Sequence, residues 1–179
     1  MLSSYYSQDL VFFSILVAVL ASYTALNMTS RVSQSQGRAA ALWLTGGAFA
    51  MGFGIWSMHF IGMLAFKLPI ALGYDLTLTG LSFIAAVGSS AFALWLVSRA
   101  TLPLSHIAGG ALLMGVGIAA MHYIGMAAMM ITPGIHYLPG LFALSILIAV
   151  LASGAALWIA FRLRDAPSAP SSARHWPLW

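Results

Sequence analysis

Five long apolar stretches run through this chain and limit the folds open to it. They cover residues 10–28, 40–66, 76–98, 104–131 and 141–161. The hydrocarbon core of a bilayer is about 30 Å thick, and a helix of roughly 20 apolar residues crosses it. Charged residues make up only 6% of the 179 residues, against about 25% in soluble domains, which argues against a water-soluble enzyme or a disordered chain. We predict an all-α fold, a polytopic transmembrane helix bundle in which five spans are present.

The basic residues indicate how such a bundle is oriented. Six of the seven fall in segments that share one side of the membrane when five spans alternate: Arg31, Arg38, Arg99, Arg162, Arg164 and Arg174. Only Lys67 falls on the other side. The positive-inside rule places the arginines in the cytoplasm and the N-terminus outside. The net charge of +4 comes from these span ends, so we expect the lipid bilayer as a partner and no nucleic acid.

The spans repeat. Residues 47–63 align with residues 110–126 at a constant offset of 63, which pairs His59 with His122. Residues 14–22 nearly match residues 145–153, and residues 82–90 match them more loosely. The unit is a plain helix followed by a helix that carries Met and His. A third histidine would fall at about position 185 by the same offset, past Trp179. We therefore expect one sensor domain at residues 1–164, with residues 165–179 as a cytoplasmic linker or the start of a further span.

Each Met/His helix concentrates potential metal ligands on one side. His59 and Met63 are four residues apart, as are His122 and Met126, so each pair shares a helix face. Imidazole with thioether suits copper, above all Cu(I), and haem held by the two histidines is a lower-ranked alternative. Intramembrane ionisable residues are functional candidates by default, although packing alone is the rival explanation. Neither helix contains a carboxylate, so we predict no enzymatic activity for this chain.

The run from Gly54 to Phe66 and the run from Met121 to Met126 resemble the repeated motif of the MHYT family of bacterial integral-membrane sensor domains. The resemblance covers residues 9–164 and implies a module of seven spans with its motifs near the outer face. The fourth motif position holds Ile61 and Ile124 where the family has Thr. The family is proposed to bind copper and to sense oxygen, carbon monoxide or nitric oxide. Carried over to this sequence, the implied metal ligands are Met58, His59, Met63, Met121, His122 and Met126.

The resemblance also implies a place in the cell and a partner. The expected function is that of a sensory module in the bacterial inner (cytoplasmic) membrane. Its cytoplasmic output would be a diguanylate cyclase, a cyclic-di-GMP phosphodiesterase or a kinase. Two rival functions are a copper-handling or transport module and a purely structural membrane scaffold. The sequence does not set the oligomeric state, and a homodimer is one state that it allows.

Overall fold

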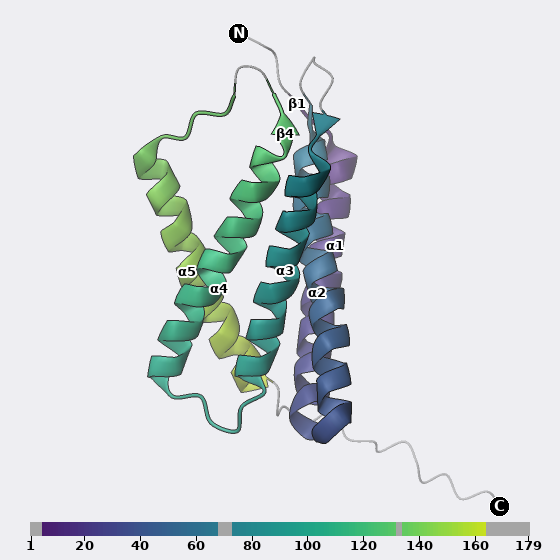
Figure 1. The fold of residues 1–179 in the computed structure, drawn as a ribbon, viewed down its shortest axis with the longest axis vertical. Helices are drawn as coiled ribbons and strands as arrows, with labels where there is room; N and C mark the ends of the chain where they lie inside the picture. Colours follow the sequence, from purple (N-terminus) through teal and green to yellow (C-terminus); the bar gives the residue numbers. More distant parts are fainter. Residues whose placement is uncertain (1–4, 68–72, 132–133, 164–179) are drawn as a thin grey trace, which may run out of the picture.

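The computed structural model describes residues 5–67, 73–131 and 134–163, and in these ranges it is a bundle of five long helices (Figure 1). All five are long and apolar enough to cross a membrane, which confirms the predicted all-α bundle. The helices are α1 Gln8–Gln34, α2 Gly37–Ala65, α3 Leu76–Val97, α4 Leu104–Ala127 and α5 Pro139–Leu163. The predicted linker at residues 165–179, which includes Arg174, lies outside the described residues, and so does Arg164.

Three of the predicted spans are too long at their C-terminal ends: the third ends at Val97 instead of residue 98, and the other two end just before a strand. The second ends at Ala65 instead of residue 66, and the fourth ends at Ala127 instead of residue 131. The chain leaves each of these two helices to form a strand pair at one end of the bundle. These pairs are antiparallel: β1 Tyr5–Tyr6 with β2 Phe66–Lys67, and β3 Gly73–Tyr74 with β4 Met129–Met130. Hydropathy missed both changes because Phe66, Met129 and Met130, which follow the two helices, are as apolar as the helix interiors.

The strand pairs repeat the sequence periodicity at the level of single hydrogen bonds. The backbone N–H of Ser7 donates to the carbonyl of Ala65 at 2.9 Å, and that of Asp75 donates to the carbonyl of Ala128 at 2.8 Å. The two acceptors are 63 residues apart, as the histidines are. Asp75 also caps α3, because its carboxylate accepts a hydrogen bond from the backbone N–H of Leu78 at 2.8 Å, as expected of an N-cap.

Helices of neighbouring repeats cross at glycines. A Cβ added to Gly52 of α2 would lie 2.6 Å from the Cα of Val87 in α3, and a Cβ on Gly115 of α4 would lie 2.5 Å from the Cα of Val150 in α5. Both positions therefore require the absence of a side chain, which lets the two backbones touch. The same crossing is thus built twice, once in each repeat. The surrounding core lies mainly on α3, where Leu94 is 1% exposed.

Arginine and tryptophan mark one end of the bundle. Arg31 lies 4.7 Å from the ring centroid of Trp43, Arg99 lies 4.0 Å from that of Trp95, and Arg162 lies 5.3 Å from that of Trp158. These distances allow cation–π attraction. We call this the arginine end. The strand pairs lie at the opposite end (Figure 1). We call it the histidine end because His59 and His122 lie near the ends of α2 and α4 that lead to these strands.

Candidate metal site

The two motif histidines meet at the histidine end. His59 lies less than two turns before the end of α2, and His122 lies in the same position on α4. Their ring centroids are 4.9 Å apart with an interplanar angle of 61°. The matched depth follows from the repeat, because α2 and α4 run in the same direction and end in the same way. The structure therefore brings together two imidazoles that the sequence separates by 63 residues.

A cavity of about 410 Å³ lies beside the two rings. Both histidines line it, together with three of the predicted methionine ligands: Met58, Met63 and Met126. The other residues at its wall are Tyr6, Ser14, Gly62, Phe66 and Met129. The cavity lies among α1, α2, α4 and the short strands, so imidazole nitrogens and thioether sulfurs from two helices face one space.

Glycine fixes how His59 packs. An added Cβ at Gly125 of α4 would lie 2.8 Å from His59 Nε2 and 3.2 Å from its Cδ2. The imidazole therefore packs against the α4 backbone where a larger residue would displace it. The Nε2 atom is enclosed and has no hydrogen-bond partner in the described residues. A buried polar atom left unpaired costs about 1–3 kcal/mol, so this nitrogen is the strongest single indication that the site binds a ligand.

His122 differs from its counterpart. The repeat pairs the two histidines at equivalent helix positions, but His122 is exposed on α4 whereas His59 is half-buried on α2. His122 packs edge-on against the ring of Tyr123, with centroids 5.0 Å apart. The two repeats are thus equivalent in sequence but not in surroundings, because α2 is flanked by α1 and α3 while α4 is flanked by α3 and α5.

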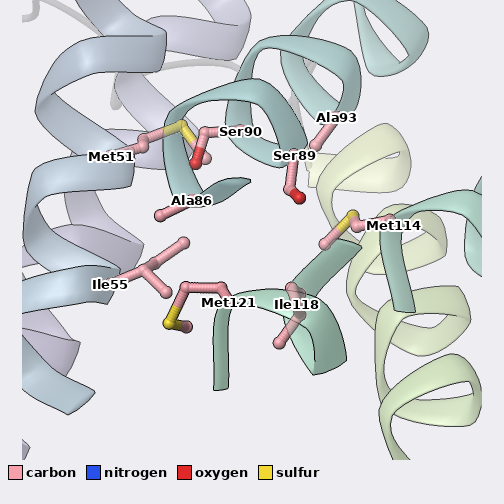
Figure 2. Close-up of a pocket in the computed structure, with 9 residues that line it drawn as sticks. All are labelled: Met51, Ile55, Ala86, Ser89, Ser90, Ala93, Met114, Ile118 and Met121. Atoms are coloured by element: carbon pink, nitrogen blue, oxygen red, sulfur yellow. The ribbon is translucent and has the colours of Figure 1, made fainter. Parts of the chain in front are cut away.

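Met121 is separated from the other predicted ligands. It is 3% exposed and lines a different, much smaller cavity of about 20 Å³ with Met51 and Met114 (Figure 2). Its repeat counterpart Met58 lines the histidine cavity. Each of these methionines precedes its motif histidine by one residue, which corresponds to a rotation of about 100° around the helix axis. A small difference in the rotation of the helix therefore changes which cavity the methionine side chain lines.

Four residues at the histidine cavity were missed by the sequence reasoning: Tyr6, Ser14, Phe66 and Met129. Ser14 Oγ donates a hydrogen bond to the carbonyl of Met58 at 3.0 Å, and the rings of Tyr6 and Phe66 lie 5.3 Å apart. The repeat carried a usable signal for two of them, because Phe66 and Met129 are related by the offset of 63. Tyr6 lies before the first span, and nothing in its sequence context indicated the strand that brings it to the site.

Aromatic residues surround the site on the α3 side. Trp56 Nε1 donates a hydrogen bond to Ser82 Oγ at 3.0 Å, and its ring lies 4.7 Å from that of Phe60. Tyr74, just before α3, packs 5.8 Å from the same Phe60 ring. Its hydroxyl has no hydrogen-bond partner among the described residues, and burial raises the pKa of Tyr74 above its ordinary value. These contacts hold the turn of α2 that carries His59 between α3 and the strands.

The donor set restricts which metal the site suits. Across residues 5–67, 73–131 and 134–163, no group of three or more His, Cys, Asp or Glu is placed to hold a metal ion. A metal at this cavity would therefore take sulfur from methionine in addition to the two imidazoles. Such a mixture favours copper over hard ions such as Mg²⁺ or Ca²⁺.

Comparisons with known proteins agree with the repeat. The family model described as "Bacterial signalling protein N terminal repeat", MHYT, matches twice, at residues 52–110 and 115–171. The bifunctional diguanylate cyclase/cyclic di-GMP phosphodiesterase MucR of Pseudomonas aeruginosa is 71% identical over 164 residues, which are 92% of this chain and 24% of that protein. The cyclic di-GMP phosphodiesterase NbdA of the same species is 48% identical over 92% of this chain and 21% of its own length.

A more distant relative is the signaling protein YkoW of Bacillus subtilis, which is 40% identical over 88% of this chain and 20% of its own length. The chain spans about a quarter or less of each of these relatives. No solved structure matches it. The two family matches together cover more than half of the residues, so this chain belongs to the MHYT family of bacterial signalling repeats.

Proposed function

We propose that this chain is a membrane-embedded sensor that holds copper between α2 and α4. The observation that carries the proposal is the convergence of His59 and His122 on one cavity with three thioethers. The unpartnered Nε2 of His59 supports a bound group there. Haem fits less well, because axial imidazoles must lie on opposite faces of a porphyrin. Rings with centroids 4.9 Å apart leave no space for a macrocycle between them.

Copper at this position would respond to two kinds of signal, a diatomic gas and a redox change. Cu(I) binds diatomic gases at an open coordination position, and it changes its charge and preferred geometry on oxidation. The chain's own residues contribute the donors and restrict access. Tyr6 and Phe66 of the strand pair line the cavity at the histidine end, so a small neutral gas could enter from that end. We propose oxygen, carbon monoxide, nitric oxide or a redox change as the signal.

The direction of signalling follows from the charge distribution. We propose that the arginine end faces the cytoplasm, as the positive-inside rule favours, and that the copper site therefore lies near the outer face of the bacterial inner membrane. MucR and NbdA are named for cyclic di-GMP turnover, and we propose an output of that class for the protein that carries this chain. A change in ligation would shift α4 against α2, and the packed glycine crossings would transmit that shift along rigid helices.

Carbon monoxide offers a direct test. The purified chain in lipid nanodiscs is loaded with Cu(I) without oxygen and exposed to carbon monoxide, and the infrared C–O stretch is recorded. We expect a copper-bound band in the wild type that is absent from the His59→Ala/His122→Ala variant. The exposed His136 supplies the control, because His136→Ala should keep the band. A wild type without a band, or a double variant with an unchanged one, would rule out gas binding at this site and leave the scaffold or transport functions.

A further inference from the structure

A second, much smaller cavity lies where α2, α3 and α4 meet (Figure 2). Its volume of about 20 Å³ exceeds the roughly 10–15 Å³ that one water molecule needs. Most of its wall is apolar and consists of Met51 and Ile55 from α2, Ala86 and Ala93 from α3, and Met114, Ile118 and Met121 from α4. The two remaining lining residues, Ser89 and Ser90 of α3, bring hydroxyl groups to the wall.

The two serine hydroxyls differ in their hydrogen bonds. Ser90 is 2% exposed, and its Oγ has no hydrogen-bond partner among the described residues. The hydroxyl of Ser89 donates to the carbonyl of Ala85 at 2.8 Å, so its hydrogen is used but its oxygen can still accept a bond. Figure 2 shows both hydroxyl oxygens turned toward the cavity. The cavity wall therefore offers one hydroxyl that can donate and one that can accept.

We propose that this cavity binds one ordered water molecule, held by the hydroxyls of Ser89 and Ser90. The water accepts a hydrogen bond from Ser90 Oγ and donates one to Ser89 Oγ. Its second hydrogen faces thioether sulfur, which is a weak acceptor. The water thus has two or three partners, within the range of two to four that buried waters show. This site is independent of any metal at the histidine cavity, because no residue lines both cavities.

The repeat supplies a matched control for Ser90. Its counterpart at the offset of 63 is Ser153 of α5, which is 3% exposed and whose Oγ also has no hydrogen-bond partner among the described residues. Ser153 does not line the small cavity. A buried hydroxyl without a partner destabilises the fold, whereas one that holds a buried water contributes to it. Ser90→Ala should therefore lower the melting temperature of the purified chain in lipid nanodiscs, and Ser153→Ala should leave it unchanged or raise it.

X-ray radiolytic footprinting of the same preparation detects the water itself. A short X-ray pulse converts a buried water into a hydroxyl radical, which oxidises an adjacent methionine to the sulfoxide. Met121 is the reporter, because it lines the small cavity and is only 3% exposed. Mass spectrometry should find Met121 oxidised in the wild type and in Ser153→Ala, and protected in Ser90→Ala. Ala86→Val should protect it too, since Ala86 is 2% exposed at the cavity wall and the added methyl groups would fill the space.

Three results would overturn the proposal. If Met121 stays unoxidised in the wild type, the small cavity is dry. If Met121 is oxidised equally in the wild type and in Ser90→Ala, the radicals come from water that Ser90 does not hold. If Ser90→Ala and Ser153→Ala change the melting temperature equally, the hydroxyl of Ser90 gains nothing from its place at the cavity. The melting curves also report whether each variant has folded.

Discussion

Gly125 allows the site to be disturbed without removing any ligand. In Gly125→Ala the new Cβ would lie 2.8 Å from His59 Nε2, whereas ordinary contact begins at 3.4 Å. The imidazole must therefore move by about 0.2 to 0.6 Å, which reaches the roughly 0.5 Å tolerance of a preorganised site. Disturbing a residue that orients a metal ligand typically costs 10–100-fold in affinity. We expect Cu(I) affinity at the histidine cavity to fall by about that factor, equivalent to roughly 1.4–2.8 kcal/mol.

The matched control is Gly80→Ala on α3, because Gly80 does not line the histidine cavity. An added Cβ at Gly80 would meet nothing within 4 Å, so the Cu(I) affinity of this variant should stay near that of the wild type. Both changes add the same methyl group and the same gain in helix propensity, about 1 kcal/mol. Competition between the protein and a Cu(I) chelator gives the affinities, and thermal melting checks folding. Equal affinities for the two variants would refute the inference that Gly125 positions His59.

Three further predictions concern the packing that holds the site. Gly52→Ala should destabilise the bundle by about 1–3 kcal/mol through overpacking, because its Cβ would lie 2.6 Å from the Cα of Val87. Gly88→Ala meets nothing within 4 Å and should be neutral or stabilising in the same denaturation assay, so equal losses would contradict the close crossing. Asp75→Ala should cost about 1 kcal/mol as a lost N-cap and Asp75→Asn much less, and equal losses would exclude the capping role. Trp56→Phe removes an interhelical hydrogen bond and should cost about 0.6–1.7 kcal/mol, and an unchanged melting temperature would show that this bond contributes nothing.

The sequence predicted the helices because length and apolar composition are the requirements for crossing a bilayer. It also predicted that His59 and His122 lie at the same depth, because a constant offset between helices of the same direction produces that match. The strand pairs were not predictable, since their hydrogen bonds join segments about 60 residues apart in the chain. Phe66, Met129 and Met130 are also as apolar as the helix ends that they follow.

The division of methionines between two cavities could not be read from the repeat. Met58 and Met121 occupy equivalent positions, yet Met58 lines the histidine cavity and Met121 lines the cavity of about 20 Å³ that it shares with Met51 and Met114. Internal symmetry predicts equal side-chain directions, whereas the direction in the folded protein depends on which helices flank each repeat. The exposure of His122 has the same origin. The repeat therefore predicts how deep a side chain lies along the bundle axis. It does not predict which helices surround that side chain.

The central claim is that His59 and His122 bind the same copper ion. Pulsed electron paramagnetic resonance of the Cu(II)-loaded chain counts the imidazoles coupled to one metal centre. We predict two coupled imidazoles in the wild type and one in each of His59→Ala and His122→Ala. A wild-type spectrum with a single imidazole, or with none, would contradict the claim.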